Sequence, residues 1–228
     1  MIALEKTIKA TMGYVENNYL RNPRIINNEY RARLQSFQVP AIKKHFGHLE
    51  GKCFADIGCG DIPLGYCQEE MGRPKKYYAT DLNRKALASG LKSMKKSGID
   101  ISNMEIISGP YFDFDLIPNA SIDAAFSNSL FSHLSLNTIL ICLKRLRPKM
   151  ANHAKYLSSM IILPPGIDCI EYKWEVKHGA TSHAAKDPFH YRFSEFKKVV
   201  DSCTDFTCHN SYEYGHPFQA LVEFLPKS

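Results

Sequence analysis

The stretch KCFADIGCG, residues 52 to 60, decides the fold. The short apolar run at residues 52 to 57 predicts a buried strand. Gly58 and Gly60 then predict a tight turn, because glycine adopts backbone conformations that other residues avoid. A strand that runs into a glycine turn and then a helix is typical of the nucleotide-binding end of a doubly wound sheet. We therefore expect a helix directly after the turn.

Strands and helices continue to alternate behind this turn. Short apolar runs predict strands at residues 77–80, 104–107, 122–126 and 156–163, and helical periodicity predicts helices at 84–96 and from 136 onward. Two further strands, 206–214 and 219–225, are close enough for an antiparallel hairpin. Such alternation implies a parallel sheet covered on both faces. We predict an α/β, Rossmann-like doubly wound seven-stranded sheet with a C-terminal antiparallel hairpin.

Three regions organise the chain. Residues 1–50 read as a helical extension or lid, broken near Pro23 and Pro40. Residues 51–228 form the main domain, and 165–193 lack clean periodicity, which suits a cap inserted over a site. Ser194 is expected to cap a helix that follows the cap.

Composition excludes several classes of protein. With 228 residues, 44% hydrophobic and 23% charged, the chain is far from the disordered regime. Its seven cysteines include no C-x-x-C pair, so neither a disulfide framework nor a metal site is indicated. No apolar run is long enough to span a membrane and the N-terminus does not read as a signal peptide, so we expect a cytoplasmic protein. A net charge of +6 permits nucleic acid as a partner but does not favour it, because lysine pairs usually lie on solvated helix faces.

The glycine turn favours one cofactor over another. The dinucleotide fingerprint needs a third glycine where this chain has Pro63. Asp56 and Asp61 flank the turn and would repel a pyrophosphate. S-adenosylmethionine carries a sulfonium and an ammonium group but no phosphate. The residues therefore favour S-adenosylmethionine over NAD.

The sequence also resembles a known family. Residues 56–60 (DIGCG) resemble motif I of the class I S-adenosylmethionine-dependent methyltransferases, and residues 78–82 (YATDL) resemble that family's second strand, which ends in an acid. Residues 116–128, 130–134, 187–194 and 219–224 are similar to later segments of its small-molecule members, so the resemblance covers about residues 50 to 226. It implies S-adenosyl-L-methionine as cofactor, S-adenosyl-L-homocysteine as product, and Asp81 on the ribose hydroxyls. The cofactor-binding residues that it implies are Asp56, Gly58, Cys59, Gly60, Asp81, Leu82, Ser127 and Asn128.

Two positions depart from the family pattern. Ile62 stands where many members have a third glycine, and residues 108–110 (SGP) stand where many have an acid for the adenine amino group. Asp113 or a backbone carbonyl near it could replace that acid. Asp81 could instead cap the helix that starts near Arg84. Ser127 and Asn128 are also a common pair at helix starts.

Candidates for catalysis and acceptor binding follow the fourth strand and lie in the cap. His133 is the candidate general base, which is needed only if the acceptor loses a proton, and a lone histidine is more often structural. His183, His190 and Tyr191 could bind the acceptor. We expect in-line transfer to a small-molecule, sugar or lipid-linked acceptor. An NAD-dependent oxidoreductase and a non-catalytic RNA-binding or partner-binding module remain as alternatives, and the sequence does not indicate the oligomeric state.

The sequence disfavours two kinds of DNA methylation. Residues 127–130 (SNSL) do not match the [DNS]-P-P-[aromatic] turn of amino-methylating enzymes. Carbon-5 methylation of cytosine needs a thiolate nucleophile, commonly in a Pro-Cys turn, and no cysteine of this chain follows a proline.

Overall fold

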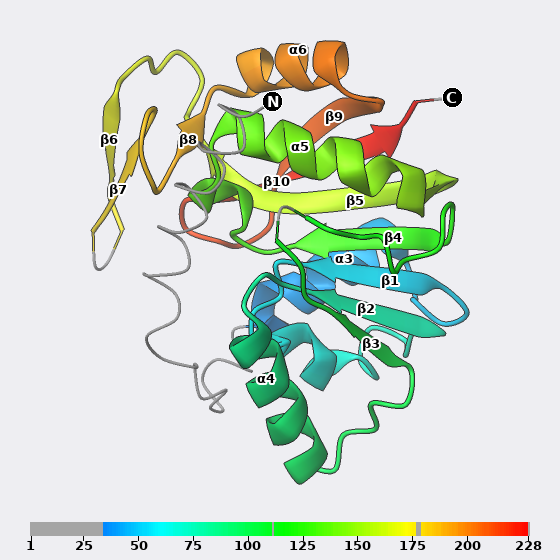
Figure 1. Cartoon of the computed structure of the whole chain (residues 1–228). Coiled ribbons are helices and arrows are strands. Elements are labelled where there is room, and N and C mark those ends of the chain that lie inside the picture. Colours follow the sequence, from blue (N-terminus) through cyan, green and yellow to red (C-terminus); the bar gives the residue numbers. More distant parts are fainter. Residues whose placement is uncertain (1–33, 111, 177–178, 228) are drawn as a thin grey trace.

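The structure, a computed structural model, describes residues 34–110, 112–176 and 179–227. Its main sheet has the strand order β3-β2-β1-β4-β5-β10-β9, with the short β8 paired beside β5 (Figure 1). The strands are β1 (Cys53–Ile57), β2 (Lys76–Thr80), β3 (Met104–Ile107), β4 (Ile122–Ser127), β5 (Met150–Ile162), β8 (His190–Tyr191), β9 (Phe206–Glu213) and β10 (Ala220–Pro226). β1 to β5 pair in parallel, whereas β10 is antiparallel to both β5 and β9. The predicted doubly wound sheet and C-terminal hairpin are confirmed.

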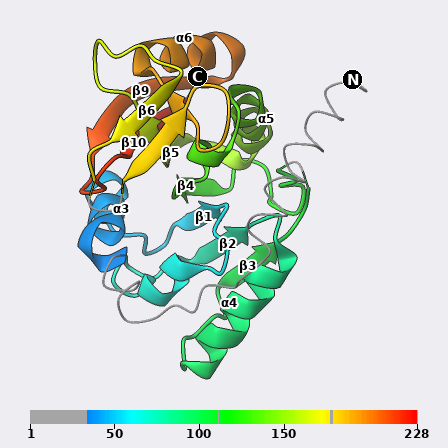
Figure 2. The ribbon, with the colours of Figure 1, turned by 90° about the vertical axis from the view of Figure 1, so that its left-hand side faces the viewer.

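Helices cover both faces of the sheet, and α3 and α5 lie on opposite sides of it (Figure 2). The α-helices are α3 (Val39–Phe46), α4 (Arg84–Lys96), α5 (Leu136–Leu146) and α6 (Phe193–Cys203). Apolar residues of α5 and α6 pack into one core, and those of α3 and α4 pack into the core on the other face. Burial of these apolar stripes stabilises the layers by roughly 25 cal/mol per Å² removed from water.

Short helical turns complete the chain. They are η1 (Leu34–Gln38), a π-helix, and the 3-10 helices η2 (Pro63–Cys67), η3 (Phe131–His133) and η4 (Arg147–Lys149). The helix expected after the glycine turn is η2, a 3-10 helix of five residues. Ile62 precedes η2 with φ of 58°, a left-handed conformation that a β-branched residue rarely adopts. The chain therefore leaves the turn abruptly.

Other boundaries also differ from the sequence prediction. Pro40 does not break the helix but lies in the first turn of α3, where its missing N–H costs nothing. Arg192 is the N-cap residue of α6, so Ser194 lies inside that helix and the expected cap is wrong. β5 begins at Met150, six residues before the predicted start at Tyr156.

The structure describes part of the predicted N-terminal lid and most of the predicted cap. Residues 1–33 of the predicted lid lie outside the described residues, while Leu34 to Leu49 contribute to the core beside β1. In the cap, β6 (Glu171–Trp174) and β7 (Ala180–His183) form an antiparallel hairpin. Among the described helices, none is long and apolar enough to cross a membrane.

Candidate functional site

The glycine turn lies where the strand order reverses, between β1 with β2 on one side and β4 on the other. Gly58 and Gly60 have φ of 69° and 57°, as their sequence predicts. A Cβ atom at Gly58 would meet the Leu130 side chain at 2.8 Å. Glycine therefore lets the turn touch the segment that follows β4.

The main-chain amides of this turn already have partners inside the protein. The N–H groups of Gly58 and Cys59 donate to the Thr80 carbonyl at 2.8 and 3.0 Å. The N–H of Gly60 donates to Oδ2 of Asp81 at 2.8 Å. Because a pyrophosphate binds through such amides and a helix N-terminus, this turn lacks what a dinucleotide requires.

Asp81 has the geometry of a ligand-binding carboxylate. Its Oδ1 accepts from the Asn83 N–H at 2.7 Å, in addition to the Gly60 contact of Oδ2. Asn83, and not Asp81, caps α4, because its Oδ1 accepts from the Ala86 N–H at 3.0 Å. Burial raises the pKa of Asp81, while the two backbone hydrogen bonds lower it. Each carboxylate oxygen can accept a further hydrogen bond, so Asp81 retains capacity for two hydroxyl groups.

Asp56 lies deeper than the sequence suggested. Its carboxyl is buried, and the Tyr77 hydroxyl donates to its Oδ2 at 2.7 Å. Burial, opposed by the Tyr77 hydrogen bond, raises its pKa to about 7. At neutral pH this carboxyl carries only part of a negative charge, so the electrostatic preference for a cationic cofactor depends more on Asp61 and Asp81.

The remaining cofactor candidates divide into exposed and buried groups. The side chains of Leu82 and Asn128 are partly exposed, whereas Cys59 is buried. Ser127 is fully buried, with its hydroxyl 2.8 Å from the Tyr156 hydroxyl, so its side chain belongs to the sheet interior. Asp113 is exposed and lies in the segment that follows β3. A Cβ atom added at Gly109 would lie 2.8 Å from the Cβ of Asp113, so the two residues are in close contact.

One glycine of this site was missed in the sequence. A Cβ at Gly90, in the middle of α4, would lie 2.2 Å from the Asp61 carbonyl oxygen. Glycine is unfavourable in a helix interior, which is the signal that could have found it. Its absence of a side chain lets α4 pack directly on the end of the glycine turn.

Hydroxyl and amide side chains gather near the carboxyl ends of β4, β5 and β9. This polar cluster consists of Asn128, Ser129, Ser159, Tyr214 and Gln219. Oε1 of Gln219 accepts from Ser159 at 2.8 Å and from Ser129 at 3.1 Å. Ser129 adopts φ of 58°, and such strain is often retained at functional positions. Only Asn128 of this cluster was found in the sequence, because its members come from separate segments.

His133 pairs with a residue of the cap. Its Nδ1 lies 2.6 Å from Oδ1 of Asp187. The same region of the cap is held by the Phe189 N–H, which donates to the Ser132 carbonyl at 2.6 Å. Asp187 was not identified from the sequence, which gave no signal for this contact across 54 positions.

The three acceptor-binding candidates of the cap all contact protein groups. His183 lies 3.4 Å from Glu171, and His190 contacts the Ser182 hydroxyl and the Cys169 carbonyl through its two ring nitrogens. Tyr191 donates to the Leu134 carbonyl, and burial raises the pKa of its phenol. Their roles toward an acceptor stay predictions.

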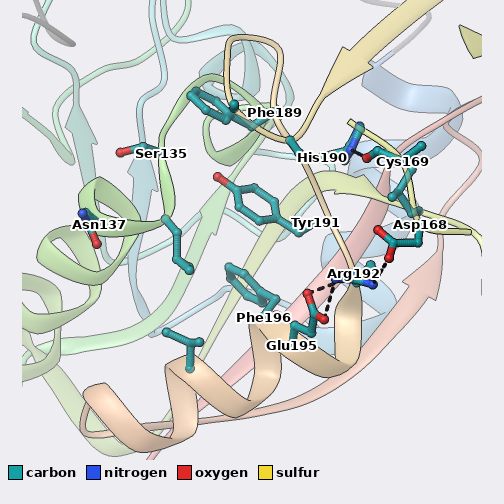
Figure 3. A pocket seen from close by; sticks show the side chains of 15 residues that line it. Ser135, Asn137, Asp168, Cys169, Phe189, His190, Tyr191, Arg192, Glu195 and Phe196 are labelled. Atoms are coloured by element: carbon teal, nitrogen blue, oxygen red, sulfur yellow. Dashed lines mark hydrogen bonds and ion pairs between the residues drawn. The ribbon is translucent and has the colours of Figure 1, made fainter. Parts of the chain in front are cut away.

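A pocket of about 520 Å³ lies between the cap, α5 and α6 (Figure 3). Phe189, Tyr191 and Phe196 line it, and its Arg192 pairs with Asp168 and Glu195 at 3.0 and 2.6 Å. None of the predicted cofactor residues lines this pocket. It is therefore separate from the glycine turn.

Comparisons with known proteins agree with the geometry. No protein-family model and no curated protein matches the sequence. Among solved structures, a S-adenosylmethionine-dependent methyltransferase from Aquifex aeolicus is 18% identical with a TM-score of 0.62, over 85% of this chain and 93% of the other. The 1,6-didemethyltoxoflavin-N1-methyltransferase of Burkholderia thailandensis, bound to its substrate and S-adenosylhomocysteine, is 15% identical with a TM-score of 0.64, over 98% and 89%.

A third similar structure matches almost the whole length of both chains. It is the magnesium protoporphyrin IX methyltransferase of Synechocystis PCC 6803 with bound S-adenosylmethionine, 11% identical with a TM-score of 0.59, over 99% of this chain and 96% of the other. At such identities the likeness establishes the fold. This chain has the Rossmann-like fold of the class I S-adenosylmethionine-dependent methyltransferases.

Proposed function

We propose that this protein is a S-adenosylmethionine-dependent methyltransferase. The observation that carries the proposal is Asp81 at the end of β2, which accepts from the Gly60 amide and retains acceptor capacity for the two ribose hydroxyls. The methyl donors or products bound in similar structures support the same cofactor. When bound, S-adenosylmethionine supplies an electrophilic methyl group.

The occupied amides of the glycine turn argue against NAD. Thr80 and Asp81 together accept from three consecutive N–H groups, 58 to 60. A five-residue 3-10 helix follows, which provides no α-helix N-terminus for a pyrophosphate. Since S-adenosylmethionine has no phosphate, it fits this turn without displacing those hydrogen bonds.

The acceptor side of the proposal concerns the segment after β4. We propose in-line transfer to a small-molecule, sugar or lipid-linked acceptor bound next to Asn128. His133 would act as general base where the acceptor must lose a proton. The Asp187 carboxylate at 2.6 Å favours the tautomer with a proton on Nδ1, so Nε2 is the basic nitrogen. His190 and Tyr191 would fix the cap through their contacts with protein groups.

Calorimetric titration with S-adenosylhomocysteine, beside NAD in the same buffer, tests the cofactor. Micromolar binding of S-adenosylhomocysteine alone is the expected result. Binding of NAD alone would contradict the proposal and favour an oxidoreductase. Binding of neither, together with RNA binding that weakens steeply with salt, would favour a non-catalytic RNA-binding module.

A further inference from the structure

The polar cluster and an adjoining set of aromatic rings lie at one end of the sheet. Gln219 lies directly before β10 and touches Ser159 of β5, and Asn128 and Ser129 directly follow β4. Because β10 is antiparallel to β5, its first residue pairs with Met160 near the carboxyl end of β5. This cluster therefore shares the sheet edge with the glycine turn, where the ends of β1 and β4 meet.

Gln219 has an unused hydrogen-bond donor. The residue is 8% exposed, and its Oε1 accepts hydrogen bonds from Ser129, Ser159 and Tyr214 at 3.1, 2.8 and 3.4 Å. No described residue accepts a hydrogen bond from its Nε2 amide. Nε2 of Gln219 is not among the fully buried unpartnered atoms of the described residues, so this amide stays accessible and can donate a hydrogen bond to a ligand atom.

A series of neighbouring aromatic rings includes Tyr214 of the polar cluster. This aromatic arc consists of Phe37, Tyr214, His216, Phe218 and Trp174. The ring centroids of Phe37 and Tyr214 are 5.5 Å apart, and the Tyr214 and His216 rings are nearly parallel at 13°. Phe218, next to Gln219 in the chain, lies 4.7 Å from His216 and 6.1 Å from Trp174 of β6. Phe37 and Tyr214 are buried, whereas His216, Phe218 and Trp174 are partly exposed, so the last three rings can pack against a flat ligand ring.

Neither set contains a Lys, Arg, Asp or Glu residue. A charged acceptor buried here would lose its hydration and gain no ion pair from these side chains. A neutral molecule avoids that cost. The chemistry of the site thus combines aromatic rings with one amide donor that no described residue uses.

We propose that the methyl acceptor is a neutral, planar ring whose carbonyl oxygen or ring nitrogen accepts a hydrogen bond from Nε2 of Gln219, with the aromatic arc against its faces. The inference rests on the proposed methyltransferase function and specifies its acceptor. It makes Gln219 a residue that determines specificity.

The single tryptophan of the chain, Trp174, offers a direct measurement. Because it belongs to the aromatic arc, its fluorescence should respond to a ring bound beside Phe218. The probes are 2-pyridone and 2-quinolinone, neutral lactams of one and two rings, with 1-naphthoate as a charged ring. Each is titrated into protein saturated with S-adenosylhomocysteine, whose own binding is measured separately by calorimetry.

Gln219→Glu removes the amide donor and keeps the side-chain size, and Gln219→Met serves if the glutamate variant does not fold. The same amide-to-acid change at exposed Asn152, near the start of β5, is the matched control. We expect saturable quenching by a lactam, at least tenfold weaker binding in the Gln219 variant, unchanged binding in Asn152→Asp, and equal affinity for S-adenosylhomocysteine throughout.

Three results would overturn this acceptor while leaving the cofactor assignment intact. In the first, S-adenosylhomocysteine binds but neither lactam does. In the second, a lactam binds the wild type and the Gln219 variant with equal affinity. In the third, 1-naphthoate binds more tightly than both lactams. Failure of S-adenosylhomocysteine itself to bind would instead contradict the proposed function, and with it the inference that rests on it.

Discussion

Two halves of one sheet edge are built in different ways. At the glycine turn, consecutive residues of one segment and the acid after the next strand form the site, largely through main-chain amides such as that of Gly60. At the polar cluster, side chains from three separate segments meet, and their hydroxyls converge on Gln219. The first half suits a ligand part that is common to many enzymes. The second suits a molecule that differs from one enzyme to another, because side chains change more readily than a backbone turn.

The largest effect should come from the contact between His133, which follows β4, and Asp187 of the cap. Once a screen with labelled methyl donor has identified an acceptor that must lose a proton, His133→Gln should lower kcat about 100-fold, the lower end of general base catalysis. The acid limb of the pH–rate profile should disappear with it. Calorimetry should find S-adenosylhomocysteine binding unchanged.

Asp187→Asn is the accompanying variant, because it removes the carboxylate and keeps the shape. It should lower kcat and leave KM unchanged, since the Asp187 carboxylate contacts Nδ1 of His133 and orients the ring. A loss of melting temperature in both variants with an unaltered pH profile would assign the pair a structural role alone.

Asp81→Ala addresses the glycine-turn half. Loss of its hydrogen bonds to a ligand should weaken S-adenosylhomocysteine binding by about 1 to 3 kcal/mol, since hydrogen bonds to a charged carboxylate are stronger than those to a neutral group. Calorimetry measures the affinity, and circular dichroism checks that the variant is folded. Unchanged affinity in a folded variant would remove the ribose assignment.

The pH dependence of stability probes the interior below the same turn. The pKa of Asp56 is raised to about 7 in the folded protein, from 3.8. Its contribution is fully present below the unfolded pKa and is lost as pH rises through the folded value. Between pH 5 and 7 the free energy of unfolding should fall by about 2 kcal/mol from this group, at about 1.4 kcal/mol per pKa unit.

Urea unfolding at several pH values measures that decline. Asp56→Asn should flatten it but not abolish it, because burial also raises the pKa of Asp81. An identical decline in Asp56→Asn and the wild type would show that Asp56 is not the group responsible.

Asn83→Ala should give the smallest effect and separates capping from ligand binding. Loss of the bond from the Ala86 N–H should lower stability by about 1 kcal/mol. Affinity for S-adenosylhomocysteine should stay within twofold of the wild type, as measured by calorimetry beside a urea titration. A large loss of affinity would mean that Asn83, and not Asp81 alone, holds the ligand.

Local sequence determined the first half of this edge. Alternating apolar runs predicted β1, β2 and β4, and α4 was predicted at its observed bounds, because 3.6-residue periodicity is a local property. The glycines at 58 and 60 predicted a turn, and both adopt positive φ angles in the structure. The same information could not predict that η2 would be a 3-10 helix, since Ile62 turns the chain before an α-helix can start.

Tertiary structure alone decided the rest. Whether Asp81 caps α4 was open until the hydrogen bonds placed Asn83 on the Ala86 amide and Asp81 on the glycine turn. His133 and Asp187, or Ser129 and Gln219, are adjacent because strands far apart in the chain end at one edge of the sheet. Sequence periodicity reports which face of an element is apolar, but contacts between distant segments depend on strand order, which only the folded chain fixes.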